Sequence, residues 1–136
     1  MTAAWITGWL AVAAMAVAVG VPIYQRVKHG KRAAPGSEPI RLHVVIGLTV
    51  SACAFGHTLL ILPELGSPAA TAGGMLALLP GGVAFVFMLA HAGLGLQLRD
   101  PKLKKRPDVR RSHTITATLI AIFVAIHAVA LERAAR

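Results

Sequence analysis

Residues 43–57 read HVVIGLTVSACAFGH, and residues 113–127 read HTITATLIAIFVAIH. Each stretch is an uncharged, mostly apolar run with a histidine at both ends. The longer apolar segments around them, residues 38–62 and 108–131, are each long enough for a helix that crosses a hydrocarbon core of ~30 Å. The two stretches predict two membrane-spanning helices, each with one histidine at each of two depths in the membrane.

The composition also indicates a membrane protein. Of the 136 residues, 56% are hydrophobic and 14% are charged, against roughly 45–50% and about 25% in soluble domains. The net charge is +9, but the Lys and Arg residues lie between or after the apolar segments, so no nucleic-acid partner is expected. The single cysteine, Cys53, excludes an intrachain disulfide framework and a Cys-ligated iron–sulfur cluster within this chain.

We predict an all-α fold, a single transmembrane domain over residues 1–136 with four helices that form an antiparallel bundle. The predicted spans are residues 3–24, 38–62, 82–98 with an irregular lead-in from residue 69, and 108–131. Ser37 is the expected N-cap of the second span, with Pro39 in its first turn. Pro80-Gly81-Gly82 is expected to form a loop or kink. The first span has no basic segment before it, so it is expected to be retained rather than cleaved as a signal peptide.

The distribution of Lys and Arg predicts the orientation. Five of them follow the first span up to Arg41, seven lie in residues 99–111, none lies in the loop between the second and third spans, and two lie in the tails. By the positive-inside rule, the two basic loops face the cytoplasm and both termini face outside. The Ala-rich, short-looped character suggests a multi-pass protein of a bacterial cytoplasmic membrane.

The histidine spacing is the most informative pattern in the chain. His43 and His57 are 14 residues apart, as are His113 and His127. Fourteen residues are close to four helical turns and rise about 21 Å, so both members of a pair share one side of the helix, one toward each membrane face. The two spans run in the same direction because one span separates them. His43 is therefore expected level with His113, and His57 level with His127.

Two facing imidazoles suit a flat cofactor that supplies four equatorial nitrogens of its own, and haem b is such a cofactor. Zinc fits poorly, because it needs three or four ligands that converge on one point. We call His43 and His113, which are expected nearer the cytoplasm, the inner pair, and His57 and His127 the outer pair. Arg41 and Arg111 each lie two residues before an inner histidine, where a guanidinium can neutralise a haem propionate. The expected site is therefore two haem b groups with His43, His113, His57 and His127 as iron ligands.

The chain resembles the integral-membrane di-haem cytochromes b: the cytochrome b561-like proteins, the cytochrome b subunits of hydrogenases and formate dehydrogenases, and the four-helix core of the bc complexes. The resemblance rests on the two His-x13-His spans within four spans and covers nearly the whole chain. Gly81 and Gly95, also 14 apart, are similar to paired glycines that face the haems in the bc-type core, whereas Gly8 and Gly20 of the first span are 12 apart. The resemblance implies electron transfer across the membrane, with a partner redox subunit and often a quinone.

Several alternatives remain open at this level. His91 could replace an inner ligand, bond a propionate, contact a quinone or simply bridge two helices. Whether the chain counts as an enzyme is undecided, because it would be an electron-transfer subunit of an oxidoreductase complex. The alternatives are a transmembrane ferric or ascorbate-type reductase, and a histidine-based proton or metal transporter or sensor without haem.

Overall fold

A computed structural model describes residues 3–66 and 75–134, and this part of the chain is helical between its turns and loops. The elements are α1 (Ala3–His29), α2 (Glu38–Ile61), the short 3-10 helix η1 (Leu62–Glu64), α3 (Met75–Gln97) and α4 (Arg106–Ala134). All four α-helices contain segments long and apolar enough to span a membrane. The four-helix, all-α prediction is therefore confirmed.

Helix α1 extends beyond the predicted span. The helix continues past the predicted span, which ends at residue 24, to His29. There Gly30 takes a positive φ of 63° and its N–H donates to the Arg26 carbonyl. Glycine adopts this left-handed conformation without the steric cost of a Cβ, so it ends the helix readily. The added turn presents its polar side chains beyond the apolar segment, and Lys28 Nζ donates to the Tyr24 hydroxyl at 2.8 Å.

Helix α2 begins and ends where the sequence predicts, within one residue. Ser37 occupies the N-cap position and Pro39 lies in the first turn. The cap differs in one respect: the Ser37 side chain makes no capping hydrogen bond, and its hydroxyl oxygen is buried without a hydrogen-bond partner. The Ser37 carbonyl instead accepts the Arg41 N–H at 2.9 Å.

Helix α3 contradicts the prediction of a start at residue 82. It is helical from Met75 and continues through Pro80, Gly81 and Gly82 to Gln97. Proline and glycine break helices in water, but in an apolar environment an unpaired backbone group is so costly that the helix persists around them. Residues 69–74 of the expected lead-in lie outside the described residues.

Helix α4 is longer than predicted at both ends, and an ordered loop precedes it. The Arg106 guanidinium donates to the Leu98 carbonyl at 2.8 Å and also to the Asp100 carbonyl, while an Asp100 side-chain oxygen accepts the Lys102 N–H at 2.9 Å. These bonds satisfy backbone groups in the loop and support the start of the helix at Arg106, two residues earlier than residue 108.

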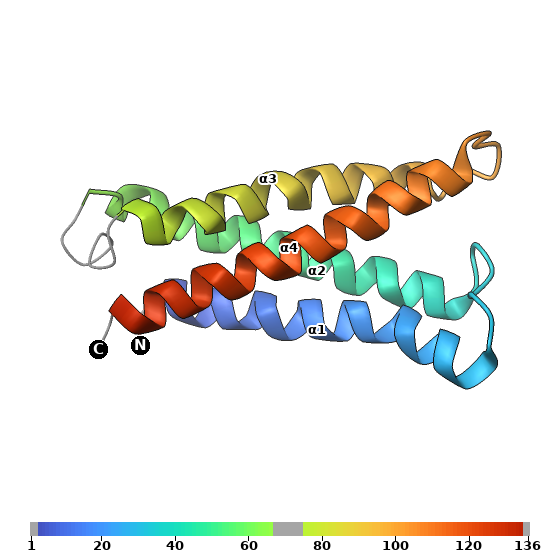
Figure 1. The fold of residues 1–136 in the computed structure, drawn as a ribbon, viewed down its shortest axis with the longest axis horizontal. Helices are drawn as coiled ribbons and strands as arrows, with labels where there is room; N and C mark the ends of the chain where they lie inside the picture. The colour runs from blue at the N-terminus through green and yellow to red at the C-terminus, as the bar shows by residue number, and fades with distance from the viewer. Residues whose placement is uncertain (1–2, 67–74, 135–136) are drawn as a thin grey trace.

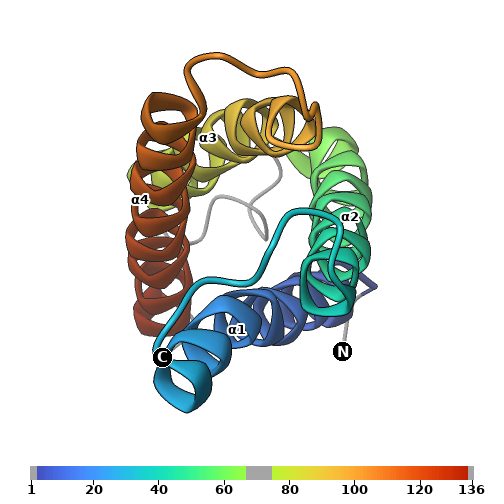
Figure 2. The ribbon, with the colours of Figure 1, turned by 90° about the vertical axis from the view of Figure 1, so that its right-hand side faces the viewer.

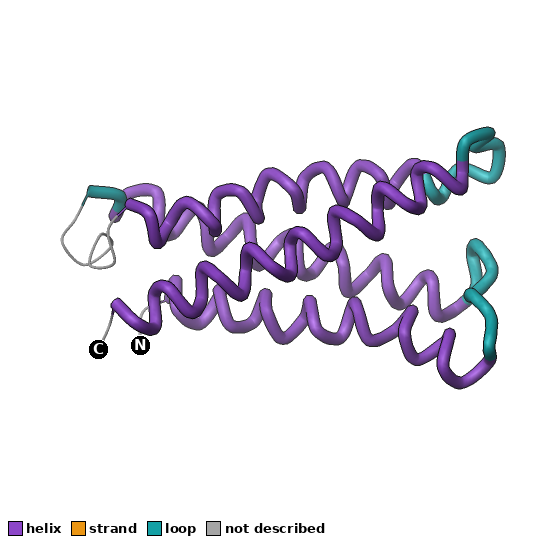
Figure 3. The backbone as a smooth tube through the Cα atoms, viewed as in Figure 1, coloured by secondary structure: helices purple, strands orange, loops and turns teal. Residues whose placement is uncertain are grey.

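The bundle consists of two helical hairpins (Figure 1). Helix α1 packs closely along α2, and α3 packs closely along α4, whereas the two hairpins touch mainly where α2 meets α3. Viewed from the end, the helices follow one another around a ring, with α2 and α4 on opposite sides (Figure 2). The loops after α1 and before α4 lie together at one end of the bundle, called the basic end here (Figure 3). These loops and the helix ends beside them carry most of the Lys and Arg residues.

The hairpins bury few side chains between them. In the described part of the chain no side chain is below 2% exposed, and the buried residues are Ala18, Ala77, Ala84, Met88 and Ile120. Ile120 lies seven residues from both His113 and His127, and Ala84 lies midway between Ala77 and His91. The two helices α3 and α4 thus each bury a residue in the middle layer, between the two histidine levels.

Candidate functional site

Four half-buried histidines form the candidate site. Helix α2 carries His43 toward the basic end and His57 toward the opposite end, and α4 carries His113 and His127 in the same order. Each helix places its two histidines on one side because they are 14 residues apart. The site is thus built from two helices that belong to different hairpins.

Every one of these rings is held by a backbone carbonyl of the neighbouring helix in its own hairpin. His43 Nδ1 lies 2.8 Å from the Ala18 oxygen and His57 Nδ1 lies 2.8 Å from the Ala4 oxygen, both on α1. His113 Nδ1 lies 3.1 Å from the His91 oxygen and His127 Nδ1 lies 2.9 Å from the Ala77 oxygen, both on α3. A carbonyl oxygen can only accept, so each Nδ1 carries the hydrogen.

The tautomer has a direct chemical consequence. A neutral imidazole with hydrogen on Nδ1 keeps its lone pair on Nε2, which is the nitrogen left to bind a metal. Metal-ligating histidines generally donate their other N–H to a carboxylate, carbonyl or water, which fixes the ring orientation. The four histidines share this arrangement.

The acceptors follow the same 14-residue repeat as the histidines. Ala4 and Ala18 are 14 apart on α1, and Ala77 and His91 are 14 apart on α3. The sequence interpretation missed these partners, because any residue type supplies a backbone carbonyl. The repeat itself shows that each hairpin holds its two rings in the same way.

Glycines make room for three of the rings. A Cβ at Gly8 would lie 3.2 Å from the Cε1 of His57, one at Gly95 would lie 3.2 Å from the Cε1 of His113, and one at Gly81 only 2.9 Å from the Cε1 of His127. Each glycine stands four residues after the acceptor. For His43, whose acceptor is Ala18, the residue four positions later is Pro22. Gly8 and Pro22 on α1 are therefore 14 residues apart, like Gly81 and Gly95 on α3.

The two inner rings are spaced as ligands of one metal ion would be. Their centroids, in His43 and His113, lie 6.3 Å apart. A metal–imidazole bond is about 2 Å long, and a ring with bonds of about 1.33 Å places its nitrogen roughly 1.1 Å from the centre, so two imidazoles on opposite sides of one ion have centroids roughly 6.2 Å apart. The distance fits a single ion between the rings.

The outer rings are placed by their hairpins. His57 is held against α1 by Ala4 and Gly8, and His127 is held against α3 by Ala77 and Gly81. Phe55 on α2 contacts Phe85 on α3, with centroids 5.6 Å apart, and joins the hairpins in this half of the bundle. Space also remains along α2, since a Cβ at Gly47 or Gly56 would meet no atom within 4 Å.

Arg41 and Arg111 lie at the basic end, and both side chains are exposed. Each stands two residues before the inner histidine of its own helix. They are placed symmetrically on α2 and α4, because Arg111 follows Arg41 by the same 70 residues that separate His113 from His43, and each guanidinium is available to an anionic group at that end.

His91 is packed against the inner site. Its ring stacks on His113, with centroids 3.7 Å apart and an interplanar angle of 15°. Its Nδ1 lies 3.0 Å from both the His113 carbonyl oxygen and Thr116 Oγ1. The His91 and His113 rings therefore each bond the other residue's backbone carbonyl, which locks α3 to α4 at this level.

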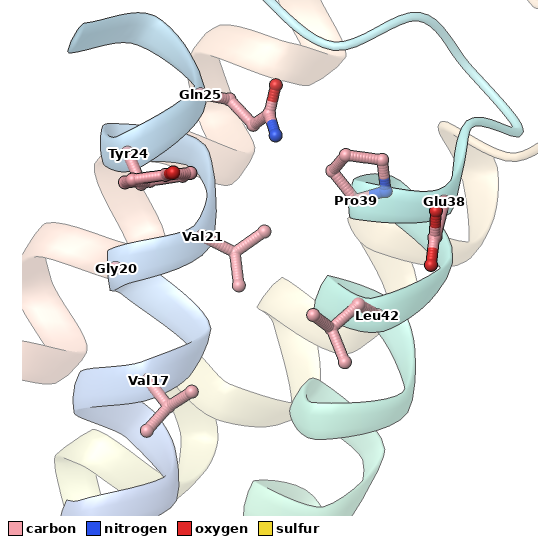
Figure 4. A pocket seen from close by; sticks show the side chains of 8 residues that line it. All are labelled: Val17, Gly20, Val21, Tyr24, Gln25, Glu38, Pro39 and Leu42. Atoms are coloured by element: carbon pink, nitrogen blue, oxygen red, sulfur yellow. The ribbon is translucent and has the colours of Figure 1, made fainter. Parts of the chain in front are cut away.

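A groove of about 390 Å³ runs between α1 and α2 near the basic end (Figure 4). Its wall is mainly apolar, and Val17 and Leu42 of the wall are the sequence neighbours of Ala18 and His43. The lining residues are Val17, Gly20, Val21, Tyr24, Gln25, Glu38, Pro39 and Leu42.

The remaining polar side chains of the described residues include groups of the kind that metal ions need as ligands. Within the described residues, no cluster of three or more His, Cys, Asp or Glu side chains could hold a bare metal ion. Cys53 is a free, half-buried thiol, and His29 is exposed at the end of α1.

Comparison with known proteins gives no relative: no protein-family model, no curated protein and no solved structure matches this chain.

Proposed function

We propose that this protein is a di-haem b-type cytochrome that carries electrons across a membrane. One haem b would be held by His43 and His113 near the basic end, and the second by His57 and His127 near the opposite end. The observation that carries the proposal is the fourfold repeat of one ligand arrangement, in which each Nδ1–H is bonded to a carbonyl and Nε2 is left free. The 6.3 Å ring spacing of the inner pair supports it independently.

When bound, a haem supplies an iron that gains and loses one electron without a bond to substrate. The protein's own residues would set position and environment. The carbonyls of Ala4, Ala18, Ala77 and His91 orient the imidazoles, and the glycines at 8, 81 and 95 let the rings lie close to the helix backbones. The 14-residue spacing separates the two levels by about 21 Å.

The basic end would face the cytoplasm, in a bacterial cytoplasmic membrane, with both termini outside. Arg41 and Arg111 would neutralise the propionates of the inner haem, because propionates emerge at the membrane edge where these exposed guanidinium groups lie. The described residues form helices and no strand–turn–helix unit of the kind that binds nucleotides. Electrons would therefore come from a partner redox subunit at a membrane face.

We propose a quinone as the electron acceptor. The groove between α1 and α2 offers an apolar recess lined by Leu42, the residue before His43, with Tyr24, Gln25 and Glu38 as polar groups. His91 is a weaker candidate for this contact, because its Nδ1 is already engaged by Thr116 and the His113 carbonyl.

The proposal is tested by expressing the chain and measuring haem in the purified protein. We expect two non-covalent haems per chain, with a sharp α-band after reduction by dithionite. Protein that is folded and helical but binds no haem when haem is supplied contradicts the proposal and leaves a haem-free transporter or sensor as the explanation of the histidines.

A further inference from the structure

One of the four carbonyls that accept a histidine Nδ1–H, that of Ala18, lacks its usual helical hydrogen-bond donor. In an α-helix each carbonyl accepts the N–H of the residue four positions later. For Ala4, Ala77 and His91 that residue is Gly8, Gly81 or Gly95, each of which has a backbone N–H. For Ala18 it is Pro22, which lies inside α1 and has no N–H.

The Ala18 oxygen therefore lacks the helical donor that competes for the other three acceptors. His43 Nδ1–H lies 2.8 Å from it. Ala18 is also only 7% exposed, which limits the access of water to this oxygen. In a low-dielectric environment an unshared, dehydrated acceptor makes a stronger hydrogen bond.

The strength of this bond matters for a metal bound to the same ring. A histidine that donates its Nδ1–H more strongly is a more basic ligand at Nε2. A more basic ligand stabilises the ferric state, which carries the larger positive charge, relative to the ferrous state. The reduction potential of the metal is lowered as a result.

We propose that Pro22 is a positioning residue that acts through the Ala18 carbonyl and His43 to lower the reduction potential of the inner haem. This inference rests on the proposed function. It assigns a purpose to a helix-interior proline whose own side chain is exposed. It also makes the two centres unequal, because both outer ligands are held by carbonyls with a helical N–H donor.

The substitution Pro22→Ala tests the inference with little risk to the fold. Alanine is the best helix former and restores the missing N–H. In a redox titration of the haem-loaded protein, we expect the inner component, identified as the one lost in His43→Ala, to move to higher potential. The outer component is expected to keep its potential.

Pro80→Ala is the matched control. Pro80 also lies inside a helix, but it frees the carbonyl of residue 76, one position before the Ala77 oxygen that holds His127. We expect this variant to leave both potentials unchanged. A second control places lactic acid at position 22, which has the methyl side chain of alanine but an ester oxygen in place of the N–H. It is expected to keep the inner component near its original potential.

Proton NMR of the reduced, low-spin and therefore diamagnetic protein gives a readout of the hydrogen bond itself. We expect the His43 Nδ1–H resonance to lie furthest downfield of the four ligand histidines and to move upfield in Pro22→Ala. An inner component that does not move in Pro22→Ala, or that moves equally with lactic acid at position 22, overturns the inference. A chain that binds no haem overturns the proposed function instead, so the two failures are distinguishable.

Discussion

A Cβ on Gly81 would stand 2.9 Å from the Cε1 of His127, closer than non-bonded carbon atoms approach. The neighbouring Gly82 has open space at the same position. The contact shows that helix α3 is brought against the ring of α4 at a point where only a glycine fits.

Replacement of Gly81 by alanine is therefore expected to push His127 away from α3. Overpacking of this kind typically costs about 1–3 kcal/mol, and the displaced ring would also lose its bond to the Ala77 carbonyl. We expect Gly81→Ala to lower occupancy of the outer haem, measured as haem per chain, and to leave the inner one. Gly82→Ala is the control and should retain both, and equal haem loss in the two variants would show that crowding of His127 is not the cause.

The four ligand histidines should fall into two pairs when they are replaced one at a time. His43→Ala and His113→Ala are expected to remove the same spectral component, because their rings lie 6.3 Å apart at one level. His57→Ala and His127→Ala are expected to remove the other component. A reductive titration followed at the α-band measures this, and a pairing of His43 with His57 would refute the transverse arrangement.

His91 is expected to be dispensable for haem binding. It stacks on His113 and bonds Thr116, so under the proposed function it would support the ligand His113 rather than bind iron itself. The variant His91→Phe keeps an aromatic ring for the stack but loses the hydrogen bonds. We expect two haems per chain, with an altered spectrum only for the component assigned to the haem between His43 and His113. Loss of the inner haem in His91→Phe together with its retention in His113→Ala would make His91 the ligand.

Arg41 and Arg111 are expected to act on the inner centre through charge. Removal of a nearby cation favours the ferric state, so Arg41→Gln or Arg111→Gln should lower the inner potential. The groups are exposed, which limits the effect to roughly 10–40 mV, the equivalent of a surface ion pair. Arg133→Gln, at the opposite end of α4, is the control for net charge and should leave the inner potential unchanged.

The basic end is expected to face the cytoplasm. A single reactive thiol at this end, Lys102→Cys in a Cys53→Ser background, should be labelled by a membrane-impermeant maleimide in inside-out vesicles and protected in intact spheroplasts. Leu65→Cys, after η1 at the other end, should show the reverse pattern. Labelling of Lys102→Cys in intact spheroplasts would mean the opposite orientation.

The helices were predictable where an apolar run is bounded by polar residues, as in α2. The start of α3 was not, because Pro80-Gly81-Gly82 has the composition of a turn, and the sequence pattern cannot weigh the cost of an unpaired backbone in an apolar environment. Helix α1 continues beyond its predicted span because its last turn is polar and follows the apolar segment.

The level of His43 with His113 followed from chain parity and the 14-residue spacing. The carbonyl partners could not be predicted, since they belong to the backbone and carry no residue signature. The sequence pattern did not match Gly8 with a second position on α1, because a glycine was expected 14 residues later and Pro22 stands there. Pro22 acts differently from the glycines: it has no N–H to compete for the Ala18 carbonyl, whereas each glycine lacks a Cβ that would meet a ring.

An experimental density map of the purified protein tests the central claim most directly. The account predicts two flat densities between α2 and α4, one bridged by His43 and His113 and the other by His57 and His127, with each iron bound through Nε2. Side chains packed between these imidazoles, or planar groups held by other residues, would contradict it.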